Sequence, residues 1–271
     1  MPPPRRATEG DEGRALAVVR AGSGARIVLV HGFTQTGRSW RPIATALSRH
    51  HEVVRVDLPG HGRSAAVEVR DLVDAGRLVA AAGGDATYVG YSMGGRIALH
   101  AAFACPERVQ RLVLVSAHPG IDDAAERAAR RHADDALATR LEATGPGRLT
   151  IDEFLAEWLE APLFAHLDEA TSDVEARRGN TTVGLARALR ALGTGTQRFD
   201  RARLRRLALP VLVVAGGLDP TYTTLGRRLT ATIGVNATFA VIPDVGHAAP
   251  FEAPGRFAEL LAAWLESTGA A

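Results

Sequence analysis

Apolar residues in this chain form short continuous runs, separated by segments in which apolar residues recur at helical spacing. A run rich in valine, isoleucine and leucine is typical of a strand that is buried on both faces of a parallel sheet. Such runs predict strands over residues 15–20, 26–30, 53–56, 87–90, 112–116, 211–215 and 237–242. The alternation of strands with helices favours an α/β fold with right-handed crossovers.

Helical spacing predicts the intervening helices. They cover residues 39–47, 71–82, 93–104 and 223–232, and a closing segment carries Phe257, Leu260, Leu261, Trp264 and Leu265 on one stripe. A stripe of this kind packs on a core and leaves the opposite face of the helix in water. We therefore expect helices on both faces of a mostly parallel sheet.

The alternation stops between residues 117 and 200, where no strand-like run occurs. Three segments rich in alanine, arginine and acidic residues take its place, over residues 122–141, 151–159 and 182–192. We predict that residues 117–200 form a helical cap over the ends of the strands. Residues 1–116 and 201–271 then form the α/β core.

Composition narrows the class of protein. A chain of 271 residues with 46% hydrophobic and 23% charged residues is long enough for one large globular domain with an insertion. The only cysteine, Cys105, has no partner for an internal disulfide. All 32 basic residues are arginine, and the net charge of +2 offers no general attraction for nucleic acid or membranes.

The start of the chain does not resemble a targeting segment. Residues 1–13 contain arginine and acidic residues with no apolar stretch behind them, unlike a secretory signal. No apolar run approaches the ~20 residues that a membrane span requires. We expect a cytoplasmic protein that binds neither nucleic acid nor membrane and uses neither a cofactor nor a metal. The pattern does not indicate an oligomeric state.

The segment Gly90-Tyr91-Ser92-Met93-Gly94 has the G-x-S-x-G pattern of a nucleophile elbow, in which a serine stands on a sharp turn between a strand and a helix. Glycine is needed on both sides because neighbouring backbone approaches closely there. The helix that follows points free backbone N–H groups at any oxyanion that forms beside Ser92. A pattern this short needs support from the rest of the chain.

Two later loops supply that support. A serine that transfers protons needs a histidine to accept its hydroxyl proton and a carboxylate to orient the histidine. Asp219 and His247 follow the last two predicted strands, in the chain order Ser, acid, His. The carboxyl ends of parallel strands meet at one edge of the sheet, so we predict a Ser92–His247–Asp219 triad. The alternative acid is Asp122 or Asp123, which begins a predicted cap helix.

A second half of an oxyanion site is predicted after the second strand. In the turn His31-Gly32-Phe33 the backbone N–H of Phe33 can face Ser92 and join the N–H of Met93. The alternative is a plain turn with a packed phenylalanine. His31, His61 and Asp57 are expected to hold the surrounding loops together.

Clustered arginines argue against a plain esterase. Arg96 lies one helical turn past Ser92, Arg127, Arg130 and Arg131 are spaced to share one face of the first cap helix, and Arg178 lies at a later cap turn. Guanidinium groups suit carboxylates, which favours a small, multiply anionic substrate under the cap. The alternative is a solvated helix face paired with nearby Asp and Glu residues.

Together, the turn His31-Gly32-Phe33, the loop Asp57–Gly62, the elbow, Asp219 and His247 resemble the α/β-hydrolase superfamily over almost the whole chain. Further segments are similar to one branch, the 2-succinyl-6-hydroxy-2,4-cyclohexadiene-1-carboxylate synthases of menaquinone biosynthesis. These are Gly90–Arg96, His118-Pro119-Gly120 with Glu126–Arg130, Glu157–Phe164 and Leu192–Gln197. The resemblance implies an α/β-hydrolase fold, with a sheet of the eight-stranded type.

The resemblance also implies a lyase that removes a ring proton so that pyruvate leaves an enolpyruvyl-bearing substrate. By position, Ser92, His247 and Asp219 would form the base, and the N–H groups of Phe33 and Met93 would hold the developing charge. The substrate would be gripped by Tyr91, Arg96, Arg127, Arg130, Trp158 and Arg178. Which of Arg130 and Arg131 faces inward stays open. The alternatives are an esterase or carbon–carbon bond hydrolase of the same fold and, more remotely, a ligand receptor without activity.

Overall fold

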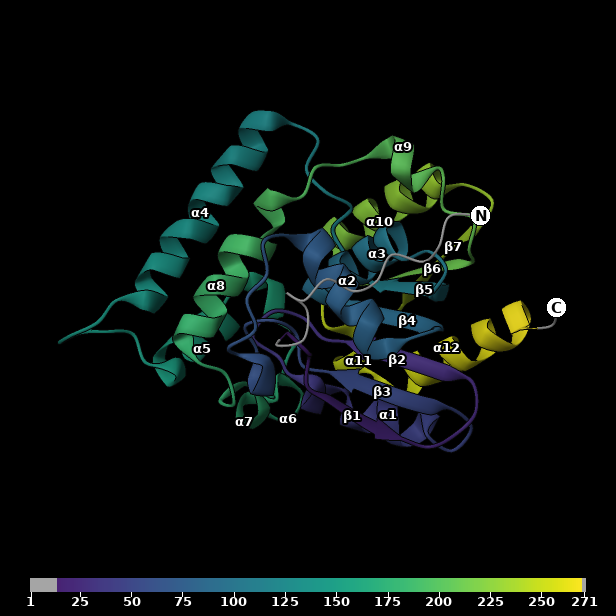
Figure 1. The fold of residues 1–271 in the computed structure, drawn as a ribbon, viewed down its shortest axis with the longest axis horizontal. Helices are drawn as coiled ribbons and strands as arrows, with labels where there is room; N and C mark the ends of the chain where they lie inside the picture. Colours follow the sequence, from purple (N-terminus) through teal and green to yellow (C-terminus); the bar gives the residue numbers. More distant parts are fainter. Residues whose placement is uncertain (1–13, 270–271) are drawn as a thin grey trace.

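A seven-stranded sheet forms the centre of the computed structural model, which describes residues 14–269 (Figure 1). The strands are β1 (Val18–Ala21), β2 (Arg26–Val30), β3 (Glu52–Val56), β4 (Ala86–Tyr91), β5 (Val109–Val115), β6 (Val211–Gly216) and β7 (Ala237–Ile242). Their order is β1-β3-β2-β4-β5-β6-β7, and only β1 pairs antiparallel. The mostly parallel α/β-hydrolase sheet is therefore confirmed.

The described residues form one strand fewer than the eight-stranded type. Only residues 14–17 of the described range precede β1, too few to fold back as another antiparallel strand. The predicted absence of a targeting segment concerns residues 1–13, which lie outside the described range.

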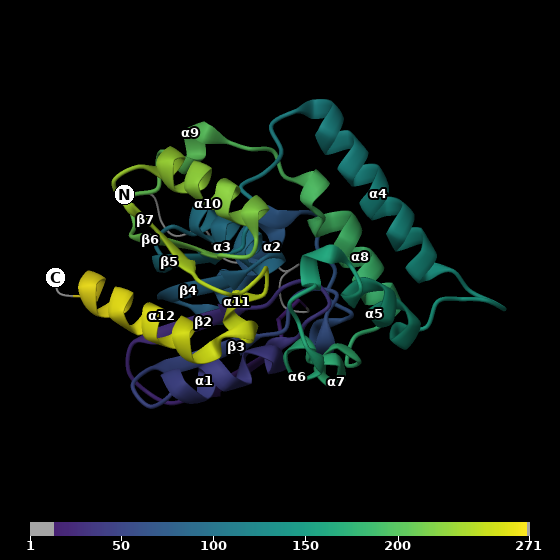
Figure 2. The same ribbon diagram turned by 180° about the vertical axis from the view of Figure 1, so that it is seen from behind.

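Helices cover both faces of the sheet (Figures 1 and 2). One face carries α2 (Leu72–Gly83), α3 (Met93–Ala104) and α10 (Pro220–Ile233), and the other carries α1 (Arg41–Leu47) and α12 (Pro254–Gly269). Each face has its own apolar core, because successive strand residues point to opposite sides. In β4, for example, Tyr88 packs in one core and Val89 in the other.

Local sequence explains where these elements begin and end. The carboxylate of Asp71 accepts a hydrogen bond from the N–H of Asp74 and caps α2, whose C-cap is Gly84 with a φ of 70°. In β2 every residue after Arg26 is buried, as expected for a strand between two parallel neighbours.

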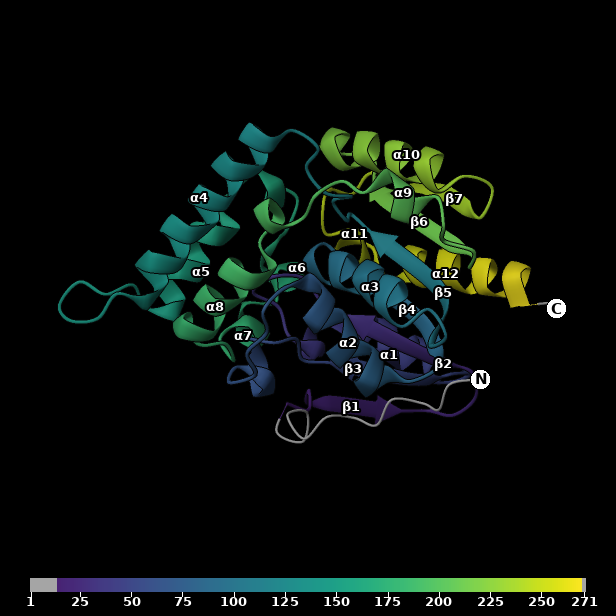
Figure 3. The same cartoon turned by 45° about the horizontal axis from the view of Figure 1, so that its top comes forward.

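A group of helices between β5 and β6, which we call the cap, lies beyond one end of the sheet (Figure 3). It contains α4 (Ala124–Glu142), α5 (Ile151–Leu159), α6 (Glu169–Ser172), α7 (Val174–Arg177) and α8 (Thr182–Leu192). The arrowheads of β2, β5 and β6 point toward the cap, so the loops after the parallel strands face it. The cap has a small apolar core of its own, which includes Phe154 and Leu189.

Candidate active site

Ser92 stands at the sharp turn between β4 and α3. It has a φ of 51° and a ψ of −113°, a conformation that L-residues rarely adopt, and its N–H donates to the carbonyl of Val115 over 2.8 Å. A Cβ on Gly94 would lie 2.3 Å from the carbonyl oxygen of Val30, and one on Gly90 would lie 2.4 Å from that of Gly94. The elbow therefore requires glycine at both positions.

The three residues predicted as a triad lie together. His247 Nε2 is 3.2 Å from Ser92 Oγ, and His247 Nδ1 is 3.0 Å from Asp219 Oδ2. Asp219 and His247 are 6% and 2% exposed, so the hydrogen bond between them is shielded from water. This arrangement lets the imidazole accept a proton from Ser92 while the carboxylate holds the ring.

The alternative acids lie elsewhere. Asp122 forms ion pairs with Arg201 and Arg228, at 3.4 and 3.2 Å. Asp123 caps α4 by accepting a hydrogen bond from the N–H of Glu126. Neither carboxylate is bonded to the triad histidine, so Asp219 is the carboxylate that orients it.

Glu252, which the sequence analysis did not consider, brackets His247. Its Oε2 accepts from the N–H of Gly246 at 2.5 Å and its Oε1 from the N–H of Ala248 at 2.9 Å. Both backbone groups beside His247 are thus held by one carboxylate. The sequence could have pointed to this residue, because Glu252 is an acidic residue that follows His247 closely in the chain.

The backbone N–H groups of Phe33 and Met93 are available to a ligand. Within residues 14–269, neither donates a hydrogen bond to a protein acceptor, although both residues line the cavity that contains Ser92. The adjacent Thr34 has a φ of 68°, so the backbone turns sharply at this point. An oxyanion site requires free backbone donors beside the nucleophile, and these two N–H groups are the candidates for that role.

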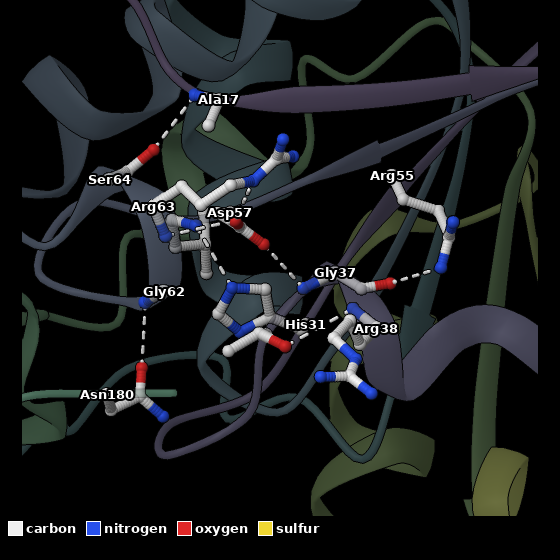
Figure 4. Close-up of polar contacts among 12 residues, drawn as sticks. Ala17, His31, Gly37, Arg38, Arg55, Asp57, Gly62, Arg63, Ser64 and Asn180 are labelled. Carbon is white, nitrogen blue, oxygen red and sulfur yellow. Dashed lines mark hydrogen bonds and ion pairs between the residues drawn. The ribbon is translucent and has the colours of Figure 1, made fainter. Parts of the chain in front are cut away.

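Buried polar residues support the loop that carries Phe33 (Figure 4). His31 Nε2 accepts from the N–H of Leu58 at 3.0 Å, and His61 Nε2 accepts from that of Thr34 at 3.3 Å. Asp57 accepts from the N–H of Gly37 at 2.8 Å. Burial lowers the pKa of His31 to about 4 and that of His61 to about 3, so both rings are neutral near pH 7. The predicted loop-holding role of these residues is confirmed.

A cavity of about 90 Å³ lies between the triad and the cap. Its lining includes Phe33, Tyr91, Ser92, Met93, Arg96, Arg130, Trp158, Phe164, Arg177 and Tyr222. A larger hollow of about 590 Å³ lies beside α3 and residues 196–204, but no triad residue lines it. Because chemistry requires the nucleophile, the smaller cavity is the candidate active site.

Three arginines line this cavity. Arg96 is 5% exposed, donates to the carbonyl of Leu192 over 2.6 Å, and has its pKa lowered to about 10 by burial. Arg130 is half-exposed and paired with Asp134 over 2.9 Å, whereas Arg131 is exposed and does not line the cavity. The question left open between Arg130 and Arg131 is therefore answered in favour of Arg130.

The placement expected for Arg127 and Arg178 is wrong. The guanidinium of Arg127 folds back on the carbonyls of Ile121 and Asp122, at 3.1 and 3.2 Å, near the start of its own helix. Arg178 is 51% exposed and pairs with Asp152 over 2.7 Å. Local acceptors satisfy both guanidinium groups outside the cavity, and neither residue lines it.

Arg177, the neighbour of Arg178, is the cavity arginine that the sequence analysis missed. It is 2% exposed, and its side chain donates to the carbonyl of Ser172 and to Thr34 Oγ1. Consecutive helical residues point about 100° apart, so only one arginine of an adjacent pair can face inward. The adjacent arginines Arg177 and Arg178 indicated that one arginine would line the cavity here. Where α7 ends determines which of the two faces inward.

Aromatic residues form the remaining wall. Trp158 packs edge-on against Phe33 at 5.1 Å between ring centroids, and its indole Nε1 is buried with no partner among residues 14–269. The Tyr91 ring lies 5.4 Å from that of His247. Tyr222, also missed from the sequence, lies 4.3 Å from His247. Its position three residues after Asp219 was the available signal.

Two further findings concern residues 14–269. None of the helices there is long and apolar enough to cross a membrane. No group of three or more histidine, cysteine or acidic side chains there has the arrangement of a metal site.

Comparison with known proteins agrees with this fold. Residues 27–260 match the model of the alpha/beta hydrolase family, so the chain belongs to that family. It is similar to the 2-succinyl-6-hydroxy-2,4-cyclohexadiene-1-carboxylate synthases of Serratia proteamaculans and Enterobacter sp., each at 32% identity. The alignments cover 94% and 87% of this chain, and 99% and 90% of the two relatives.

Solved structures support the same fold. MenH from S. aureus superimposes with a TM-score of 0.85 at 26% identity, over 93% of this chain and 98% of that one. A thermophilic esterase from Thermogutta terrifontis shares the fold, with a TM-score of 0.75 at 24% identity, over 93% of each chain.

Proposed function

We propose that this chain is a lyase that eliminates pyruvate from 2-succinyl-5-enolpyruvyl-6-hydroxy-3-cyclohexene-1-carboxylate and yields 2-succinyl-6-hydroxy-2,4-cyclohexadiene-1-carboxylate. The observation that carries the proposal is the set of three arginines, Arg96, Arg130 and Arg177, in one cavity with a serine triad. This substrate has three carboxylates, whereas a simple ester has none for these cations to bind. The names of the similar synthases support the same reaction.

The triad acts as the base in this proposal. The proton to be removed lies on ring carbon 2, next to the succinyl ketone, and is acidified by it. His247 takes the hydroxyl proton of Ser92, so that Ser92 Oγ can take the carbon-bound proton, and Asp219 stabilises the resulting imidazolium. Negative charge then develops on the ketone oxygen.

The N–H groups of Phe33 and Met93 would hold that charge. The electron pair of the broken C–H bond forms the double bond between ring carbons 2 and 3, and the former double bond moves between carbons 4 and 5. The bond between carbon 5 and the enolpyruvyl oxygen breaks, and pyruvate leaves as its enolate. Ser92 therefore accepts a proton and forms no acyl intermediate.

The arginines bind and orient the substrate. Arg96 and Arg177 are almost completely buried, so an added carboxylate gives each a charged partner away from water. Cap side chains such as Trp158 and Phe164 line the narrow cavity of about 90 Å³, and we expect them to move apart as the substrate enters.

A hydrolase of the same fold is the second candidate, because it would use the same triad and oxyanion site. Purified protein incubated with the enolpyruvyl substrate should release pyruvate, measured by a coupled lactate dehydrogenase assay. The Ser92→Ala variant should lose about 10³-fold or more of this rate. Rapid hydrolysis of an aryl acetate with no release of pyruvate would support the hydrolase and reject the lyase.

A further inference from the structure

Tyr222 has no role in the reaction described above, although it lies against the triad. The Oδ1 atom of Asp219 accepts from the backbone N–H of Tyr222 at 3.0 Å, while Oδ2 of the same carboxylate holds His247. The rings of Tyr222 and His247 lie 4.3 Å apart between centroids, at an angle of 58°. One carboxylate thus fixes both rings.

The hydroxyl of Tyr222 has no hydrogen-bond partner in the described part of the chain. Tyr222 lines the cavity together with Ser92, Arg96 and Arg130, and its hydroxyl makes no hydrogen bond to any of residues 14–269. Burial raises the pKa of this tyrosine above its ordinary value, against the opposing effect of Arg96 and Arg130. The group is therefore protonated near pH 7 and can donate a hydrogen bond to a ligand.

The three cavity arginines lie at two different places. Arg177 donates to Thr34 Oγ1 and so lies on the side of the oxyanion loop. Arg96 donates to Leu192 at the end of α8, and Arg96, Arg130 and Tyr222 are close enough to influence one another electrostatically. The cavity therefore has a second end with two guanidinium groups, of which that of Arg130 also pairs with Asp134, and one neutral O–H donor.

We infer that this second end holds the leaving enolpyruvyl arm, with its carboxylate on Arg96 and Arg130 and its ether oxygen accepting a hydrogen bond from Tyr222. The inference rests on the proposed function. In an enolpyruvyl group the carboxylate and the ether oxygen are attached to the same carbon, so neighbouring donors can bind both at once. The ketone oxygen remains at Phe33 and Met93.

The hydrogen bond strengthens as the arm leaves. When the bond between ring carbon 5 and oxygen breaks, its electron pair stays on that oxygen, which becomes the enolate oxygen of pyruvate. Tyr222 keeps its proton and donates a stronger hydrogen bond to this charge. The enolate then takes up a proton on carbon, and the proton received by His247 returns to solvent, so the triad is regenerated.

The variant Tyr222→Phe removes the hydroxyl and keeps the ring against His247. We expect kcat for pyruvate release to fall about 10- to 100-fold, with KM changed less than about threefold. Hydrolysis of an aryl acetate uses the triad and the oxyanion site but involves no enolpyruvyl arm, so the lyase rate should fall at least about fivefold more than any background ester rate. Oxalate, a planar mimic of the pyruvate enolate, should inhibit the variant about tenfold more weakly, whereas inhibition by succinate should not change.

The control Tyr88→Phe removes a buried hydroxyl that donates to Gly84 outside the cavity, and should leave both inhibition constants unchanged. Equal loss of lyase and ester rates in Tyr222→Phe would mean that Tyr222 only supports His247, and would overturn the inference. Unchanged kcat and oxalate inhibition would also overturn it, while wild-type pyruvate release keeps the proposed function. If the wild-type protein releases no pyruvate, the proposed function itself fails and the inference fails with it.

Discussion

Two adjacent arginines have opposite environments. The side chain of Arg177 is buried in the cavity wall, and that of Arg178 is half-exposed and paired with Asp152. A buried cation that binds a carboxylate is costly to remove, whereas an exposed ion pair contributes about 0–1 kcal/mol. We expect Arg177→Ala to lower kcat/KM for the enolpyruvyl substrate at least about 30-fold, chiefly through KM.

Arg178→Ala is the matched control and should change kcat/KM less than about twofold. Steady-state pyruvate release measures both variants, and thermal unfolding shows whether each is folded. Equal losses from the two substitutions would mean that Arg177 supports only the loop at Thr34 and does not contact substrate.

Glu252 positions the triad histidine from outside the cavity. In Glu252→Gln one acceptor oxygen becomes an NH₂ group that faces a backbone N–H, so the hydrogen bond to Gly246 or to Ala248 is lost. We expect kcat to fall about 10- to 100-fold, with KM nearly unchanged, because His247 is less well oriented toward Ser92. Glu266→Gln on the exposed face of α12 removes the same charge and should not alter kcat. A rise in KM at constant kcat would contradict this role for Glu252.

At the scale of elements, periodicity predicted most of the structure. The ranges 26–30, 93–104, 151–159, 182–192 and 237–242 agree with β2, α3, α5, α8 and β7, and the other predicted boundaries shifted by a few residues. Apolar spacing identifies helices and strands well, because the residues that face the core must recur with the period of the helix or strand. The helix predicted over 39–47 begins instead as a 3-10 turn, Gly37–Trp40, because Thr36 accepts from the N–H of Arg38.

The site was predictable where chain order alone brings residues together. Ser92, Asp219 and His247 each follow a parallel strand, so the topology places them at one edge. The directions of the cap arginines were harder to predict, because local hydrogen bonds and, for Arg177 and Arg178, the end of the short helix α7 determine them. Periodicity placed Arg127 and Arg130 on one face of α4, but the guanidinium of Arg127 donates to the carbonyl of Ile121, just before that helix begins. Such local hydrogen bonds leave no apolar pattern in the sequence.

Asn180 connects the cap to the core. Its Oδ1 accepts from the N–H of Gly62 at 2.9 Å, and its Nδ2 donates to the carbonyls of Thr34 and Arg177, at 2.6 and 2.9 Å. In Asn180→Asp both carbonyls would face a carboxylate oxygen, which repels them. We expect a loss of about 2–4 kcal/mol in unfolding free energy and a lower kcat, because the Phe33 loop and Arg177 shift together.

Asn236→Asp tests the same chemical change at an exposed position, where Nδ2 donates to the carbonyl of Leu207. It should cost less than about 1 kcal/mol and leave kcat unaltered. Urea unfolding and steady-state kinetics measure both variants. If Asn180→Asp behaved like Asn236→Asp, the cap would not depend on this connection.

At the scale of the whole molecule, buried neutral histidines make stability depend on pH. Burial lowers the pKa of His31 and His118 to about 4 and that of His61 to about 3, below the ordinary value of 6.5. Between pH 6.5 and 4 the unfolded chain therefore binds more protons than the folded one, so stability decreases as pH falls. The stabilisation is complete above pH 6.5, and each histidine with a pKa near 4 loses about 3 kcal/mol of it by pH 4.

Protonation of His61 should also affect the active site. A proton on Nε2 of His61 removes the acceptor for the N–H of Thr34, which lies beside Phe33. We expect the unfolding free energy from urea titrations to fall steadily from pH 6.5 to 4.5. Asp57 and Asp74, whose pKa values are lowered, lose their stabilising effect only below about pH 4, so the histidines dominate this window. In His61→Gln the longer amide side chain can reach the position of Nε2, so this variant keeps an acceptor that does not titrate and should flatten the slope, whereas His132→Gln on the exposed face of α4 should not. An unfolding free energy that is constant from pH 6.5 to 4.5 would show that these rings are not held neutral by the fold.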